Sequence, residues 1–108
     1  MASEPSFMSL TPKLLRPHIP DFLNRRMSDL MEITEAISEN DMPKIKFIAH
    51  KIRGNGATYG LPILSELAGE MEKATETLDV VHLKEITKRM FDVIKECELE
   101  LVSEKVKL

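Results

Sequence analysis

Apolar residues recur every three or four positions along four long stretches of the chain, with polar and charged residues between them. Over residues 20 to about 40, the repeat consists of Leu23, Met27, Leu30, Thr34 and Ile37. The second stretch has Ile45, Ile48, Ala49, Ile52, Gly56 and Tyr59, and the third has Ile63, Leu64, Leu67, Met71, Ala74 and Leu78. The fourth has Leu83, Ile86, Met90, Ile94, Cys97 and Leu101. Because an α-helix turns once in 3.6 residues, each set predicts the apolar face of one helix.

The segments between these stretches contain residues that begin and end helices. Asp41 is the expected N-cap of the second helix, with Pro43 in its first turn, and Asp79 is the expected N-cap of the fourth. The second helix should run to residue 58 or 59. Gly60-Leu61-Pro62 predicts a tight reversal, with Gly60 as the structural turn residue.

The chain before residue 20 has weaker signals. Residues 1–9 have no apolar period and are expected to form a loose tail. Thr11 and Pro12 indicate a short helical turn that ends before Pro17. Four amphipathic helices with short connections predict an all-α fold, namely an antiparallel up-down four-helix bundle with a short extra N-terminal helical turn. We expect one domain over residues 10–108.

Composition and charge indicate where the protein is located and which partners are excluded. Cys97 is the only cysteine, and neither a signal peptide nor a membrane-length apolar run is present, which predicts a soluble cytoplasmic protein without membrane attachment. Cys97 has the spacing of a buried residue, and a reactive thiol is the alternative. The formal net charge of −3 argues against nucleic-acid binding. The third and fourth helices lack a second apolar stripe, which favours a monomer.

His50 is the polar residue with the most informative neighbours. His50, Arg53, Gly54 and Ala57 share one face of a helix. A glycine inside a helix costs about 1 kcal/mol relative to alanine, so two glycines close together need a reason. Gly54 would let a partner approach His50, and Gly56 would allow close helix packing. Alternatively, the helix ends at Gly54-Asn55-Gly56.

Positive charge surrounds this histidine. Lys44, Lys46, Lys51 and Arg53 lie between Asp41 and Glu66, with no other acidic residue in that interval. The basic patch indicates an anionic group or an acidic partner, and a solvated helix face is the alternative.

Several kinds of site are excluded by spacing. His18, His50 and His82 lie on different segments, and His82 with Glu85 indicates only a solvated face, so no metal or other cofactor is expected. A phosphate-binding glycine-rich loop is missing, and no Ser-His-Asp or Cys-His pairing can be argued. His50 remains as a nucleophile toward a phosphoryl group. One ring nitrogen would attack while the other donates an orienting hydrogen bond, and nearby cations would stabilise phosphoryl charge.

Hairpin geometry offers an acceptor for that hydrogen bond. If the reversal centres on Leu61, His50 lies eleven residues before it and Glu72 eleven after it. Both then lie roughly 16 Å from the tip, at about 1.5 Å per residue. Glu72 would orient the imidazole, and a solvent-facing Glu72 is the alternative.

The segment around His50 resembles a known motif. Histidine-containing phosphotransfer (HPt) domains have a phosphoacceptor motif of the form A-H-x-[LIM]-[KR]-G, then five variable positions and a glycine. The chain matches it at Ala49, His50, Ile52, Arg53, Gly54 and Gly60. The order of the helices is also similar over nearly the whole chain. The departures are Arg53, where lysine is more frequent, and the second glycine at Gly56.

The resemblance implies a phosphorelay intermediate of two-component signalling. His50 would accept a phosphoryl group from a receiver-domain aspartate, or from a histidine kinase or hybrid kinase. It would then pass the group to the receiver domain of a response regulator, which supplies its own Mg ion. The chain would be a phosphohistidine carrier without autonomous catalysis. The resemblance also implies that Arg53 and Gly54 lie in the docking surface and that position 72 holds an orienting Gln or Glu.

The expected docking surface combines Phe47, Gly54 and Ala57 with the cations Lys46, Lys51 and Arg53, which would interact with phosphate or partner. Two other functions are possible. The chain could be a non-transferring helical module that binds and sequesters a receiver or kinase, or a metal-dependent enzyme, which the ligand spacing disfavours. Met1 suggests a stand-alone chain, although a segment of a hybrid kinase would look similar.

Overall fold

The computed structural model describes residues 7–106, and all regular structure in that range is helical. The elements are α1 (Phe7–Leu10), the 3₁₀ helix η1 (Lys13–His18), α2 (Ile19–Ser38), α3 (Met42–Asn55), the 3₁₀ helix η2 (Ala57–Tyr59), α4 (Pro62–Glu76) and α5 (Val80–Val106). The all-α prediction is confirmed. Within the described range, no helix is long and apolar enough to cross a lipid bilayer.

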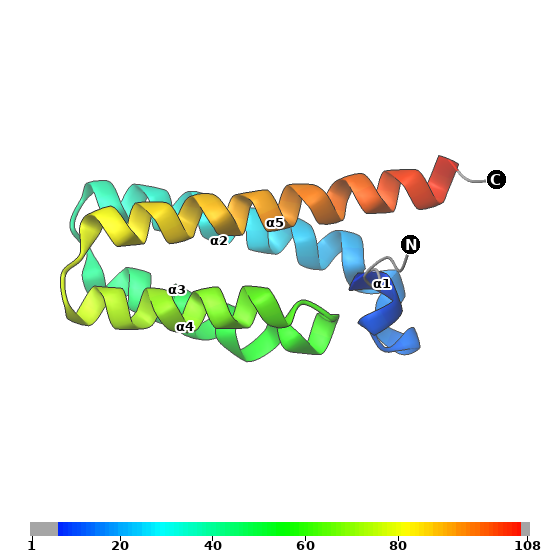
Figure 1. Ribbon diagram of the computed structural model, residues 1–108, viewed down its shortest axis with the longest axis horizontal. Coiled ribbons are helices and arrows are strands. Elements are labelled where there is room, and N and C mark those ends of the chain that lie inside the picture. Colours follow the sequence, from blue (N-terminus) through cyan, green and yellow to red (C-terminus); the bar gives the residue numbers. More distant parts are fainter. Residues whose placement is uncertain (1–6, 107–108) are drawn as a thin grey trace, which may run out of the picture.

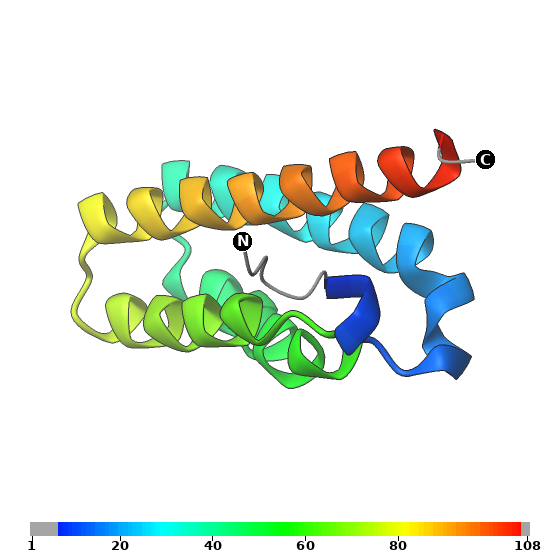
Figure 2. The same ribbon diagram turned by 45° about the vertical axis from the view of Figure 1, so that its right-hand side comes forward.

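The four long helices lie in two layers, with α2 beside α5 and α3 beside α4 (Figure 1). The chain reverses between successive long helices, so α3 and α4 form a hairpin whose tip lies near α1 (Figure 2). The last turns of α5 extend past the other helices. His50 lies on α3, and its side chain is exposed.

Apolar side chains from all four long helices form one core. The largest fully buried side chains are Ile19, Leu23, Leu30, Ile33, Ile45, Ile52, Leu64, Leu67, Met71, Leu83, Ile86 and Met90. Burying each of them contributes about 1.5–3 kcal/mol, which offsets the entropy lost when the chain folds. The core therefore fixes α3 against α4, and with it the relative position of residues on their outer faces.

The two predicted aspartate caps are confirmed. Asp41 Oδ1 accepts a hydrogen bond from the backbone N–H of Lys44 at 3.2 Å. Asp79 Oδ1 accepts one from the backbone N–H of His82 at 3.0 Å. Each carboxylate thus satisfies a backbone donor that lacks a partner within its own helix.

Three predicted core positions are wrong. Ile63 is 38% exposed because it lies in the first turn of α4, at the end of the bundle. Leu78 is 67% exposed because α4 has already ended, and its φ of 55° belongs to a turn. Thr34 is exposed because the buried stripe of α2 passes through Ile33 instead.

The N-terminal segment also differs from the prediction. The expected loose tail over residues 1–9 is wrong for 7–9, which lie in α1, and residues 1–6 lie outside the described range. Phe7 is buried because it packs against the core. Thr11 does not cap a helix: its Oγ1 lies 2.9 Å from the carbonyl oxygen of Phe7 and 2.6 Å from that of Tyr59. The following turn, η1, includes Pro17 rather than ending before it.

Candidate functional site

Three glycines shape the end of the helix that bears His50. The α-helix ends at Asn55, three or four residues before the predicted end, and the chain continues in η2. Thus the helix does end within Gly54-Asn55-Gly56. A Cβ on Gly56 would lie 2.7 Å from Ser65 Oγ, so this glycine lets α4 approach closely. Gly60 has a φ of 78°, and a Cβ there would lie 2.5 Å from the carbonyl oxygen of Phe7.

Gly54 has different surroundings. A Cβ built at this position would meet nothing within 4 Å. The missing side chain is therefore not required for packing within the chain. It leaves an open surface one turn beyond His50 on α3.

His50 and Glu72 lie side by side across the hairpin. His50 Nδ1 is 3.5 Å from Glu72 Oε2, which is within range of an ion pair and slightly long for a hydrogen bond. The His50 side chain is 74% exposed, whereas that of Glu72 is 13% exposed. An exposed imidazole thus rests against a carboxylate that the helices hold in place. Its other nitrogen, Nε2, is the one not engaged by Glu72.

Glu72 also contacts Arg53. Arg53 Nη1 lies 3.4 Å from Glu72 Oε1, the oxygen that does not face His50. One carboxylate therefore contacts both residues with separate oxygens. This holds the guanidinium and the imidazole on the same side of α3.

Three of the four cations predicted to surround His50 have an acidic neighbour. The pairs are Arg53 with Glu72 at 3.4 Å, Lys46 with Glu76 at 3.1 Å and Lys51 with Asp29 at 3.7 Å. The acids come from α2 and α4, so they are not visible in the sequence of α3 alone. Because the three cationic side chains are about half exposed, such pairs stabilise the fold by only about 0–1 kcal/mol and leave the cations accessible to an anion.

A shallow hollow lies beside the histidine. It is lined by Pro43, Lys46, Phe47, His50, Lys51 and Glu72. Phe47 is 58% exposed, and Lys51 Nζ lies 5.8 Å from the centroid of its ring. Gly54 and Ala57 are also exposed but do not line the hollow. The surface around His50 therefore offers an apolar ring, cations and an imidazole together.

Sequence reasoning missed three polar residues near this surface. Ser65 Oγ accepts a hydrogen bond from the backbone N–H of Ala57 at 2.9 Å. Arg26 and Asp29 are buried on α2, with Arg26 Nε 2.9 Å from Asp29 Oδ2. The spacing of Arg26 and Asp29 could have indicated their burial. Arg26 lies three residues beyond Leu23 and Asp29 three residues beyond Arg26, which places both near the apolar stripe of the helix.

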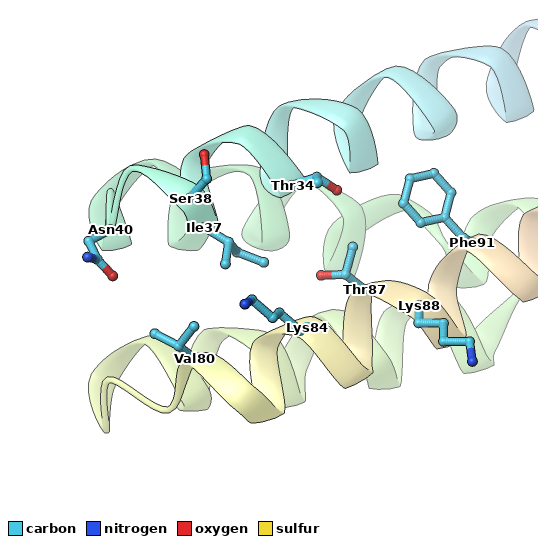
Figure 3. Close-up of a pocket in the computed structure, with 9 residues that line it drawn as sticks. All are labelled: Thr34, Ile37, Ser38, Asn40, Val80, Lys84, Thr87, Lys88 and Phe91. Atoms are coloured by element: carbon cyan, nitrogen blue, oxygen red, sulfur yellow. The ribbon is translucent and has the colours of Figure 1, made fainter.

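A second groove lies between α2 and α5 (Figure 3). Its lining residues are Thr34, Ile37, Ser38, Asn40, Val80, Lys84, Thr87, Lys88 and Phe91. It shares no residue with the hollow beside His50. Its lining includes no histidine, so it holds no imidazole comparable to that of His50.

The two other kinds of site considered from the sequence are a reactive thiol at Cys97 and a metal site. Cys97 is 5% exposed, and burial, followed by the negative charges of Glu100, Glu96 and Glu98, raises its pKa to about 12. A thiol in that state is a poor nucleophile. Among residues 7–106, no group of three or more His, Cys, Asp or Glu side chains is placed to hold a metal ion.

The fold and the site define a class of protein: a helical domain in which the exposed imidazole of His50 lies against the carboxylate of Glu72. The Hpt domain family model matches residues 19–106, and the chain belongs to that family. Domains of this family act in phosphotransfer in two-component signalling, in general as carriers rather than catalysts. No curated protein and no solved structure matches the chain.

Proposed function

We propose that this protein is a phosphorelay intermediate in which His50 is the phosphoacceptor. It takes a phosphoryl group from a receiver-domain aspartate or a histidine kinase and passes it to the receiver domain of a response regulator. The main support is the 3.5 Å contact between His50 Nδ1 and Glu72, which leaves Nε2 free, within a chain of the Hpt family. The protein acts as a cytoplasmic monomer whose long helices form an antiparallel up-down four-helix bundle.

The contact supports a specific transfer step. Nε2 of the neutral imidazole attacks phosphorus, the N–P bond forms, and the P–O bond of the aspartyl phosphate breaks, so that aspartate leaves as a carboxylate. The proton on Nδ1 stays in place, and the phosphorylated ring becomes cationic. Glu72 then stabilises this cation and fixes the ring, because a hydrogen bond between charged groups is stronger than one between neutral groups.

The surroundings of His50 supply binding rather than catalysis. Phe47, Gly54 and Ala57 form the partner contact, while Arg53, Lys51 and Lys46 attract the phosphoryl group and acidic partner residues. The receiver domain brings its own Mg ion and aspartate. The carrier itself needs no cofactor, and the interface is expected to be small and transient.

Incubation with phosphorylated receiver domains tests the proposal. The wild type should acquire one phosphate that is labile in acid and stable in alkali, as phosphohistidine is. His50→Gln should remain unlabelled, and His82→Gln, which removes the half-exposed imidazole of α5, should be labelled like the wild type. Label that persists in His50→Gln would contradict the assignment. A wild type that binds receivers without labelling would indicate a sequestering module instead.

A further inference from the structure

A line of contacts connects the interior to the hollow beside His50. The ring of Phe22 stacks on that of Tyr59, with centroids 4.1 Å apart. The Arg26 guanidinium lies 5.1 Å from the Phe22 ring centroid. Arg26 then contacts Asp29, and Asp29 Oδ1 faces Lys51 Nζ across the gap between α2 and α3.

Burial makes the middle of this line rigid. Arg26 is 8% exposed and Asp29 is 7% exposed, so neither side chain can turn outward to interact with solvent instead. Lys51 is different, because half of its side chain is exposed and its stem has many rotamers. A fixed carboxylate next to a flexible ammonium restricts where that ammonium lies. The ammonium also lies over the Phe47 ring.

Arg26 is needed because its positive charge balances the negative charge of Asp29. Asp29 alone would cancel the charge of Lys51, whereas Arg26 and Lys51 together leave a net charge of +1 on the three groups. The buried cation balances Asp29 at 2.9 Å, and the exposed cation is held at the longer distance of 3.7 Å. Lys51 is thus placed without being neutralised.

We propose that Asp29, balanced by Arg26, is a positioning residue that holds the Lys51 ammonium over Phe47 and so presets the receiver-contact surface beside His50. This inference rests on the proposed function for its consequence, although the placement can be tested by itself. Asp29 does not touch the reacting atoms. Its effect is on the encounter with the partner and not on the chemical step.

The test uses Asp29→Asn, which keeps an acceptor for Arg26 but removes the charge facing Lys51. With a phosphorylated receiver that labels the wild type, the receiver concentration at half-maximal transfer should rise about fivefold, with the maximal rate changed by less than about twofold. Labelling by phosphoramidate, a small donor that needs no docking surface, should not change. The matched control is Asp21→Asn, on the same helix but in an exposed pair with Arg25.

A double-mutant cycle separates positioning from general stability. If Asp29 acts through Lys51, then Asp29→Asn with Lys51→Ala should bind the receiver no worse than Lys51→Ala alone. Additive losses would overturn the proposal. If Asp29→Asn does not fold, Lys51→Gln breaks the same contact from the exposed side, and unchanged receiver binding in that variant would equally overturn it.

NMR of the Phe47 ring distinguishes failure of this inference from failure of the proposed function. Asp29→Asn and Lys51→Ala should shift the Phe47 ring resonances in the same direction, and Asp21→Asn should leave them in place. If no receiver labels the wild type, the proposed function fails while these shifts still decide the placement of Lys51. Unshifted Phe47 resonances in both variants would reject the placement.

Discussion

Gly54 and Gly60 lie six residues apart and have opposite surroundings. Open space surrounds the position that a Gly54 side chain would take, whereas Gly60 has a left-handed backbone pressed against Phe7 and Thr11. The first glycine is suited to contact with another molecule, and the second to contact within the chain. Substitutions at the two positions should therefore affect different properties.

For Gly54→Leu we expect loss of phosphotransfer with unchanged or slightly increased stability, because leucine favours a helix by roughly 1 kcal/mol over glycine and its Cβ would meet no atom within 4 Å. Transfer kinetics and urea unfolding measure the two effects. The contrasting variant is Gly60→Ala, which should lose about 2 kcal/mol or more through left-handed strain and the clash with Phe7. If Gly54→Leu unfolds, this glycine has a packing role after all.

Glu72→Ala should slow phosphorylation of His50 roughly tenfold, because a hydrogen bond to a charged group contributes about 1.5 kcal/mol or more. The fold should survive, since Glu72 is not part of the apolar core. Glu72→Gln keeps an acceptor without the charge and should have an intermediate rate in the same transfer assay. Glu66→Ala, an exposed change on the same helix, is the control. An unchanged rate in Glu72→Ala would reject the orienting role.

Some of the residue-scale detail can be predicted from sequence and some cannot. The proximity of His50 and Glu72 follows from counting residues on either side of one short reversal, because both helices keep a regular rise. The same count places Lys46 and Glu76 fifteen residues on either side of Leu61, and their charged groups lie 3.1 Å apart. Asp29 could not be found near Lys51 by such counting, because it lies on α2, outside the hairpin, and its position depends on how α2 packs against α3.

Helix ends in this protein are determined by a few side chains. Asp41 bonds to the backbone of Lys44 at the start of α3, and Asp79 bonds to that of His82 at the start of α5. Both residues could be recognised in the sequence because capping depends on neighbours three residues away. For the end of α3 the sequence left two alternatives, residue 58 or 59 and the Gly54-Asn55-Gly56 segment, and the structure has the second.

Replacing Asp41 with alanine should lower the free energy of unfolding by about 1 kcal/mol, as the N–H of Lys44 then loses its partner. Urea unfolding followed by circular dichroism measures the loss. Asp79→Ala should show a similar decrease. Asp92→Ala, at an exposed position inside α5, should show none. Equal stability of Asp41→Ala and wild type would mean that the cap contributes little.

The N-terminal turns show the limit of local patterns. Residues 7–10 are too short a segment to show an apolar period. They nevertheless form α1, because Phe7 packs against the core. The same tertiary effect draws Thr11 toward Tyr59, 48 residues away. An element whose stability comes from distant contacts leaves little trace in its own sequence.

At the scale of the whole molecule, the number of long helices and their order follow from four apolar periods and short connections. The core in turn determines the behaviour of Cys97, which shares its helix face with Ile94 and Met90. The predicted burial of this thiol is correct, since it is 5% exposed. Because its pKa is raised, the free energy of unfolding depends on pH.

Stability should fall in alkali partly because of Cys97. The folded thiol has a pKa of about 12, whereas its ordinary pKa is 9.0, so above pH 9 the unfolded state binds fewer protons and the free energy of unfolding decreases. Between pH 8 and about pH 10.5, the wild type should lose about 1–2 kcal/mol more than Cys97→Ala. Urea unfolding at both pH values measures the difference. Equal losses in the two proteins would contradict the raised pKa.

The contact between Thr11 and the Gly60 turn affects how this domain could be moved between proteins. The family match begins at residue 19, whereas the contacts that cover the tip of the histidine hairpin come from residues 7–11. A graft that begins at residue 19 would carry the His50 hairpin without the residues that contact its tip. For this chain, the family match therefore leaves out residues that contact the tip of the hairpin.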